Sequence, residues 1–117
     1  MKEIIAIIRP NKGKETKERL SENGFYAYST MRVFGRGKER GLRYARKVDG
    51  KEEIGGMRFL PKRLFYIMAE DDDAGRIVEI IMKANRTGQY GDGKIFVIDM
   101  DSVVRIRTGE EGREALL

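Results

Sequence analysis

Two glycine-rich segments of the chain combine glycines with basic side chains, a pairing that suits binding of an oxyanion. They are GRGKERG at residues 35–41 and TGQYGDGKIF at residues 87–96. Glycines let backbone N–H groups approach a phosphate or carboxylate closely, and lysine and arginine supply the countercharge. The glycines crowded beside Lys94 favour an anion site over a simple turn. Residues 35–41 match neither the Rossmann nor the Walker pattern, so an anion site and a solvated basic loop are equally consistent with them.

Arg105 and Arg107 are a further candidate for anion binding. They alternate in the segment VVRIRTG, and alternate residues of a β-strand point to the same face. Two guanidinium groups on one face repel each other unless an anion lies between them. A solvated strand edge explains the same pattern equally well.

Residues 71–73 are three consecutive aspartates that could bind a hard cation. They directly precede apolar residues at helical spacing, namely Ile77, Ile80, Ile81 and Ala84. Carboxylates stabilise the first turn of a helix, so a helix start is the preferred interpretation.

The composition excludes several kinds of chemistry. The chain has no cysteine and no histidine, which removes thiol nucleophiles, iron–sulfur clusters, ordinary zinc sites and histidine bases. Its net charge is +5, and residues 32–47 alone account for +6. The basic character therefore indicates a local anion site rather than a uniformly basic surface.

A length of 117 residues predicts a single domain, residues 1–117, with a core that needs no metal or disulfide. The chain has no apolar run long enough to span a membrane and no secretion signal, so we expect a soluble cytoplasmic protein. Its pattern predicts an α+β fold of the ferredoxin-like βαββαβ type with a long flexible loop between the second and third strands. The predicted strands are 2–9, 25–34, 57–69 and 94–100, the helices 12–23 and 71–84, the loop 35–56, and a short final strand 102–107.

Several segments together resemble the PII nitrogen-regulatory family over nearly the whole chain. They are KEIIAIIRP (2–10), GRGKERG (35–41), LPK (60–62), TGQYGDGKIFV (87–97) and VVRIRTGEE (103–111). The resemblance implies a homotrimer of ferredoxin-like subunits, or a hetero-oligomer with a sister protein of the same family. It also implies a long T-loop at residues 36–56 and a C-terminal tail at residues 108–117.

The resemblance implies an ATP or ADP site in the cleft between subunits. Two loops would face the phosphates, two arginines would reach them from the neighbouring subunit, and two residues would lie near the adenine. The first loop contributes Gly35, Gly37 and Lys38, and the second loop contributes Gly91, Asp92, Gly93 and Lys94. The two arginines are Arg105 and Arg107, and the residues near the adenine are Thr30 and Met68.

A 2-oxoglutarate site beside Mg²⁺-bound ATP is implied as well. Lys62 resembles the lysine that pairs with an effector carboxylate, and Glu39, Arg40 and Gly41 fall in the same region. Many relatives have a glutamine where this chain has Glu39, and that glutamine helps to hold Mg²⁺ and 2-oxoglutarate. Glu39 would repel a dianion unless the metal compensates, which makes it the candidate metal ligand together with the ATP phosphates.

The resemblance implies a non-enzymatic sensor that regulates a target through residues 36–56. The stretch GMRFLPKR (56–63) and the enlarged loop resemble the branch encoded with nitrogenase in archaea more than the ammonium-transporter branch, and both targets stay open. Lys51 lies near the place of the tyrosine that is modified in enteric relatives, and Tyr44 is a poor substitute, so uridylylation is not expected.

Two other classes of function are weaker alternatives. An RNA-binding ferredoxin-like module needs aromatic side chains on a central strand, and residues 94–100 supply only Phe96. We therefore expect no nucleic-acid partner. An enzyme is the weakest alternative because no pair of nucleophile and base is visible.

Overall fold

The computed structural model describes residues 1–36, 43–48, 51–56 and 59–117, of which 43–48 and 51–56 are described by their backbone alone. The elements are β1 (Lys2–Ile8), the 3₁₀ helix η1 (Pro10–Lys12), α1 (Gly13–Glu22), β2 (Ser29–Gly35), β3 (Arg43–Val48), β4 (Lys51–Gly56), β5 (Leu60–Ala69), α2 (Asp71–Asn85), β6 (Lys94–Asp99) and α3 (Arg113–Leu116).

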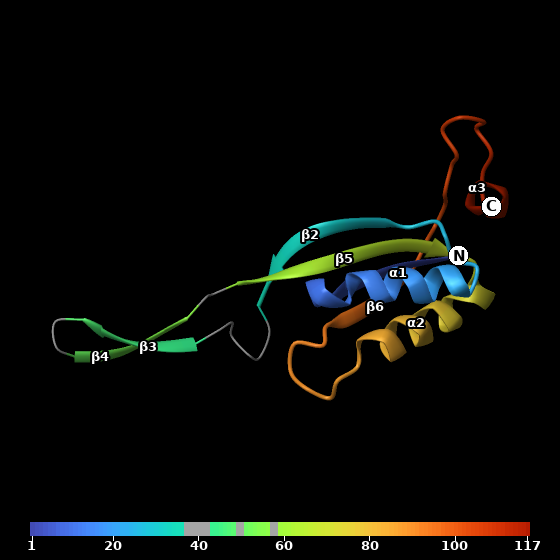
Figure 1. The fold of residues 1–117 in the computed structure, drawn as a ribbon. Helices are drawn as coiled ribbons and strands as arrows, with labels where there is room; N and C mark the ends of the chain where they lie inside the picture. The colour runs from blue at the N-terminus through green and yellow to red at the C-terminus, as the bar shows by residue number, and fades with distance from the viewer. Residues whose placement is uncertain (37–42, 49–50, 57–58) are drawn as a thin grey trace.

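Four strands form one antiparallel sheet in the order β2-β5-β1-β6. The register places Ala6 of β1 opposite Phe65 of β5 on one side and Ile95 of β6 on the other. Helices α1 and α2 lie together on one face of this sheet (Figure 1). The predicted ferredoxin-like order is therefore confirmed as β1-α1-β2-β5-α2-β6.

The core lies between the sheet and the two helices. Ile4, Ala6 and Ile8 alternate on the helix-facing side of β1, and Phe65 and Ile67 do the same on β5, as alternation in a strand requires. The helices contribute Leu20 from α1 and Ala74, Ile77 and Ile81 from α2. The helical spacing seen in the sequence thus identifies the buried side of α2. None of the helices in the described ranges has the length and apolar character to cross a membrane.

A buried polar contact fixes the two helices where the chain leaves α2. The Asn85 side-chain amide donates to the Thr16 hydroxyl oxygen at 3.0 Å and to the Ile81 carbonyl at 2.8 Å. Thr16 in turn donates to the Lys12 carbonyl at 2.8 Å. Because Asn85 is the last residue of α2, this contact holds the starting point of the loop that follows.

The second face of the sheet carries apolar side chains, and no helix within the described ranges covers them. Register places Met31, Tyr66, Met68, Phe96 and Ile98 on this open face, which is the side away from the buried residues. Met31 is 52% exposed and Ile98 is 45% exposed. An apolar sheet face of this kind is normally covered in a folded assembly.

Strand β2 begins later than predicted, at Ser29 rather than residue 25. Gly24 has φ +85° directly after α1, and the Phe25 N–H donates to the Leu20 carbonyl at 2.9 Å. This helix end turns the chain, and Phe25 and Tyr28 pack against the core before the strand starts. Helix C-capping therefore overrides the aromatic strand propensity of this segment.

Residues 35–56 were expected to contain no strands, and there the structure differs. Strands β3 and β4 pair antiparallel from Arg43 opposite Gly56 to Val48 opposite Lys51. They form a ribbon of their own that extends away from the four-stranded sheet (Figure 1). In a two-stranded ladder the inner edges pair with each other and the outer edges bind water, so it can form without the apolar periodicity by which a sequence reveals a buried strand.

The predicted final strand at residues 102–107 is wrong. Only an isolated bridge between Val104 and Glu111 forms there. The Gly109 N–H donates to the Arg105 carbonyl at 2.7 Å, and Gly109 has φ +74°, so the chain turns back on itself. A glycine at positive φ ends an extended segment at little steric cost.

Candidate functional site

A cleft of about 380 Å³ opens at the end of the sheet where β6 begins. It lies between the end of β2, the start of β5 and the loop at residues 87–93. The structure brings six predicted site residues together here, and they are Gly35, Lys62, Gly91, Asp92, Gly93 and Lys94. Residues from three distant parts of the sequence thus form one site.

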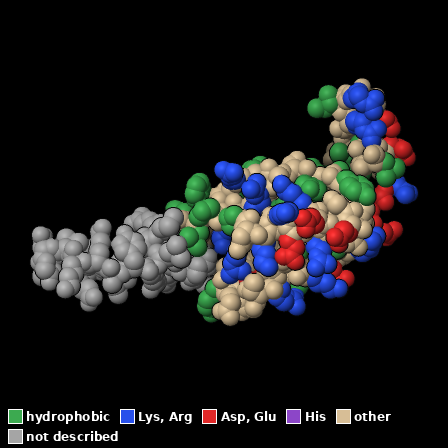
Figure 2. Space-filling view, viewed as in Figure 1, with side chains coloured by type: hydrophobic (Ala, Val, Ile, Leu, Met, Phe, Trp, Pro, Cys, Tyr) green, Lys and Arg blue, Asp and Glu red, His purple; other side chains and the backbone are tan. Residues whose placement is uncertain are grey.

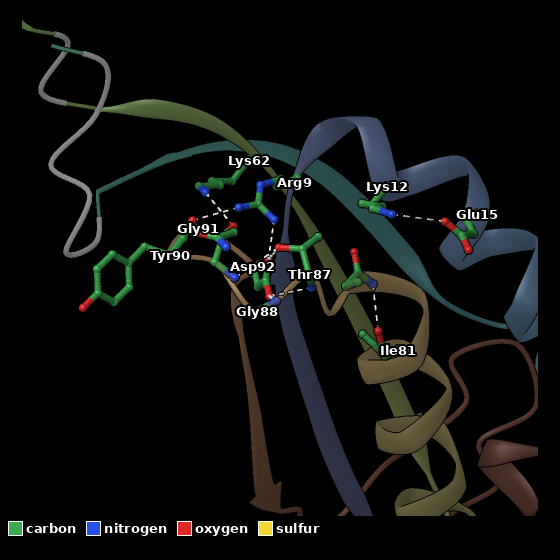
Figure 3. A network of polar contacts seen from close by, with 12 residues as sticks. Arg9, Lys12, Glu15, Lys62, Ile81, Thr87, Gly88, Tyr90, Gly91 and Asp92 are labelled. Atoms are coloured by element: carbon green, nitrogen blue, oxygen red, sulfur yellow. Dashed lines mark hydrogen bonds and ion pairs between the residues drawn. The ribbon is translucent and has the colours of Figure 1, made fainter.

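The loop at residues 87–93 is organised around the carboxylate of Asp92. Its Oδ2 accepts hydrogen bonds from the N–H groups of Thr87 at 2.8 Å and Gly88 at 2.9 Å, and its Oδ1 accepts one from the Thr87 hydroxyl at 2.5 Å (Figure 3). These bonds, the Thr87 hydroxyl first, and the guanidinium of Arg9 hold the pKa of Asp92 well below its usual range. The carboxylate is therefore ionised and points into its own loop.

Glycine is required at position 93 by space as well as by conformation. Gly93 has φ +108°, and a Cβ added there would lie 1.9 Å from the Ile7 carbonyl oxygen. Gly88 and Gly91 also have positive φ, of +86° and +97°. The predicted need for positive φ or close approach in this loop is confirmed.

Two lysines face the cleft from different strands. Lys62 of β5 is only 8% exposed, and its ammonium donates to the Gly91 carbonyl at 3.2 Å (Figure 3). Lys94, the first residue of β6, is exposed and pairs in register with Ile7. Two ammonium groups beside a glycine loop are chemically suited to phosphates or carboxylates.

Arg105 and Arg107 do not lie in this cleft. The expectation that they share one face of a strand is wrong, because no strand forms over residues 102–107. Arg105 pairs with the Glu110 carboxylate at 3.0 Å and donates to the Glu114 carbonyl at 2.8 Å. Both arginines follow the far end of β6, whereas Lys94 begins that strand, and β6 spans roughly 17–20 Å. Figure 2 shows the C-terminal segment standing clear of the domain, with basic and acidic side chains on it.

Thr30 and Met68 also lie apart. Thr30 is opposite Phe65 on the helix-facing side of β2, and its hydroxyl oxygen is buried without a hydrogen-bond partner among the described residues. Met68 is opposite Glu3 on the open face. A single copy of the chain therefore does not form the expected adenine pocket from these two residues.

The remaining predicted site residues, Gly37, Lys38, Glu39, Arg40 and Gly41, lie outside the described residues. This holds for the candidate metal ligand Glu39 as well.

The aspartates at residues 71–73 form the first turn of α2, as preferred from the sequence. Asp71 accepts a hydrogen bond from the N-terminal amino group at 2.8 Å, and this contact lowers the pKa of Asp71. Asp73 lies 3.9 Å from the Arg76 guanidinium. These contacts give the carboxylates a structural role at the helix start.

Arg9 and Thr87 both contact Asp92, and neither is among the site residues that the sequence predicts. Thr87 opens the motif TGQYGDG, so its place in the motif was a usable signal. Arg9 carried no local signal, because its partners lie more than 80 positions away in the sequence.

The structure does not support the alternative of RNA binding, because its one candidate aromatic residue, Phe96, is not on a central strand. Phe96 lies on β6, which is an edge strand of the sheet rather than a central one. The central strands are β5 and β1, and Tyr66 of β5 is engaged by Glu3. RNA-binding domains of this topology stack bases on aromatic side chains of central strands.

The fold and the cleft together define a ferredoxin-like domain with a cleft that glycines and lysines line. Comparison with known proteins specifies the class further. The family model for nitrogen regulatory protein P-II matches residues 1–110, and the chain belongs to this family. Proteins of the family are regulatory signalling proteins and are generally trimers.

The chain is similar to proteins from methanogenic archaea. It is 49% identical to the nitrogen fixation nifHD region GlnB-like protein 2 of Methanobacterium ivanovii, with both chains fully covered. It is 46% identical to the protein of the same name from Methanococcus maripaludis, over 99% of this chain and 100% of the relative. It is 40% identical to the nitrogen fixation nifHD region GlnB-like protein 1 of Methanothermobacter marburgensis, over 96% of this chain and 99% of the relative. The predicted family and its nitrogen-fixation branch are confirmed.

Proposed function

We propose that the protein is a non-enzymatic sensor that binds ATP or ADP through their phosphates in the cleft beside residues 87–93. The observation that carries this proposal is the position of Lys94 in the cleft, directly after a loop whose glycines have positive φ. Phosphates are bound by convergent N–H groups and ammonium groups of this kind. Cleft size and donor set fit the phosphate end of a nucleotide.

The complete site requires more than one copy of the chain. Arg105 and Arg107 lie beyond one end of β6 and Lys94 lies at the other, so one copy cannot place all three on one nucleotide. Thr30 and Met68 are divided between the two faces of the sheet in the same way. The uncovered apolar face supplies the surface on which copies would associate. We propose a homotrimer with the nucleotide between neighbouring subunits.

The effector is 2-oxoglutarate in this proposal. Lys62 is the residue that would pair with one of its carboxylates, because its ammonium already faces an oxygen acceptor at the cleft. Mg²⁺ would be held by the nucleotide phosphates with Glu39, and it would supply positive charge that compensates that carboxylate.

The proposed target is nitrogenase, reached through residues 36–56. Relatives of this chain are named for the nifHD nitrogen-fixation region, which supports a role in nitrogen fixation. The β3–β4 ribbon extends away from the sheet and so presents a backbone surface that a partner can approach (Figure 1). Ligands at the base of this segment would shift it between binding and release of the target.

Calorimetric titration of the purified protein with ATP, with ADP and with 2-oxoglutarate in the presence of Mg²⁺ and ATP tests the proposal. We expect saturable binding of both nucleotides, and binding of 2-oxoglutarate only when Mg²⁺ and ATP are present. Absence of nucleotide binding by the folded protein would overturn it. A parallel titration with single-stranded RNA at increasing salt should show no binding.

A further inference from the structure

Hydrogen bonds from the loop and from Arg9 occupy both oxygens of the Asp92 carboxylate. Four hydrogen-bond donors surround its two oxygens, namely the N–H groups of Thr87 and Gly88, the Thr87 hydroxyl and the Arg9 guanidinium. A carboxylate saturated in this way has no lone pair to offer a metal, and its charge would repel a phosphate. Asp92 therefore acts on the loop rather than on a ligand.

Arg9 holds the same loop at a second point. Its Nη1 lies 2.5 Å from Asp92 Oδ1, and its Nη2 donates to the Tyr90 carbonyl at 2.8 Å. Figure 3 shows the guanidinium reaching from the end of β1 across to the loop, with Lys62 on the neighbouring strand. The planar guanidinium presents donors on two nitrogens in fixed directions, which lets Arg9 hold both acceptors at once.

These contacts decide which backbone donors remain for a ligand. The N–H groups of Thr87 and Gly88 donate to Asp92, and that of Gln89 donates to the Thr87 hydroxyl oxygen at 3.2 Å. Within the part of the chain that the structure describes, no hydrogen bond engages the N–H groups of Tyr90 and Gly91. Both residues line the cleft: Arg9 holds the carbonyl of Tyr90 itself, and Gly91 lies between this carbonyl and Asp92, the second point that Arg9 holds.

We propose that Arg9 is a positioning residue for the oxyanion site. With Asp92, it fixes the loop so that the N–H groups of Tyr90 and Gly91 remain available beside Lys62 and Lys94. Arg9 itself touches no ligand in this arrangement. The inference rests on the proposed nucleotide binding for its functional consequence, but the ordering of the loop by Arg9 can be tested without any ligand.

The test compares Arg9→Gln, Arg9→Lys, Asp92→Asn and the double variant Arg9→Gln/Asp92→Asn with the unchanged protein. ATP and ADP affinities are measured by calorimetry, and amide hydrogen exchange of Thr87 and Gly88 is measured by NMR without ligand. We expect Arg9→Gln to lower the affinity for ATP and for ADP about tenfold. It should also accelerate hydrogen exchange at the amides of Thr87 and Gly88. The double variant should bind nucleotide no less tightly than the single variant with the lower affinity, because both changes remove the same contact between Arg9 and Asp92. Arg9→Lys should lie between Arg9→Gln and the unchanged protein.

Arg19→Gln is the matched control, because Arg19 is an exposed arginine on α1 far from the loop. It should leave affinity and exchange unchanged. Reduced affinity with unchanged exchange in Arg9→Gln would mean that Arg9 contacts the ligand, and this overturns the positioning role. Unchanged affinity, or losses that add in the double variant, would also overturn it. If the unchanged protein binds no nucleotide, the proposed function fails, and hydrogen exchange alone decides whether Arg9 orders the loop.

Discussion

Gly93 and Ile7 are in such close contact that position 93 has no room for a side chain. A Cβ at position 93 would lie 1.9 Å from the Ile7 carbonyl oxygen and 3.0 Å from its carbonyl carbon. The obstacle is backbone of the central strand β1, which cannot move aside as a flexible side chain would. The contact therefore fixes the distance between the cleft loop and the sheet.

Gly93→Ala should destabilise the protein. We expect the free energy of unfolding to fall by about 2–4 kcal/mol, from the clash and from the positive φ at this position. Urea unfolding measures the change. Gly75→Ala is the control, because Gly75 lies inside α2 with nothing within 4 Å of the added Cβ, and it should raise stability by about 0.5–1 kcal/mol. Equal stability of the unchanged protein and Gly93→Ala would contradict the geometry.

Lys94→Ala should weaken the binding of ATP and ADP. Loss of a charge-assisted phosphate contact of ~1.5–3 kcal/mol corresponds to about 10- to 150-fold in affinity. Calorimetry measures it, with Lys83→Ala on the exposed side of α2 as the control that should bind normally. Unchanged affinity in a folded Lys94→Ala variant would remove Lys94 from the site.

Lys62→Ala should abolish 2-oxoglutarate binding and leave ADP binding nearly intact. Lys62 is expected to pair with an effector carboxylate, whereas the ADP phosphates would be held by other groups. Titration of each ligand separates the two effects. Equal losses for ADP and 2-oxoglutarate would show instead that the bond from Lys62 to the Gly91 carbonyl is needed to hold the loop.

Glu39→Gln should preserve or strengthen 2-oxoglutarate binding, because it removes a negative charge beside a dianion. Titrations with and without Mg²⁺ and ATP provide the measurement. Binding of 2-oxoglutarate without metal would contradict the proposed role of the metal in compensating Glu39.

Asp92 should make stability depend on pH in the acid range. Its pKa is lowered in the folded state, while in the unfolded chain it is about 3.9. The charged carboxylate therefore stabilises the fold above about pH 4, and this contribution is lost as the pH falls toward the lower folded value. The difference in unfolding free energy between the unchanged protein and Asp92→Asn should be constant near neutral pH and shrink below about pH 4. Asp101→Asn, at an exposed position, is the control.

The open face of the sheet should hold the subunits together. Light scattering of the unchanged protein should give three times the chain mass of 13.4 kDa. Met31→Glu combined with Ile98→Glu should dissociate it and abolish nucleotide binding, because both positions lie on the uncovered apolar face. Lys14→Glu on α1 should remain a trimer. A mass of one chain for the unchanged protein would contradict the assembly.

Much of the fold follows from local sequence. The apolar spacing of Ile77 and Ile81 identifies the buried side of α2, and the run of isoleucines identifies β1. The glycines of residues 88–93 reveal positive φ, because few other residues adopt it at low cost. Each of these signals lies within one element, where hydrogen bonding and side-chain period determine the structure.

Only the tertiary structure decided which groups meet at the cleft. Arg9 and Asp92 are 83 positions apart, and they meet because β1 pairs with β6 and so places its end beside the loop that precedes β6. The same pairing places the Asp92 carboxylate where Arg9 joins the hydrogen-bond network of the loop. It also separates Lys94 from Arg105 by the length of a strand. Sequence motifs specify which residue types are present, whereas strand order and register fix the distances between them, and chemistry at a site depends on those distances.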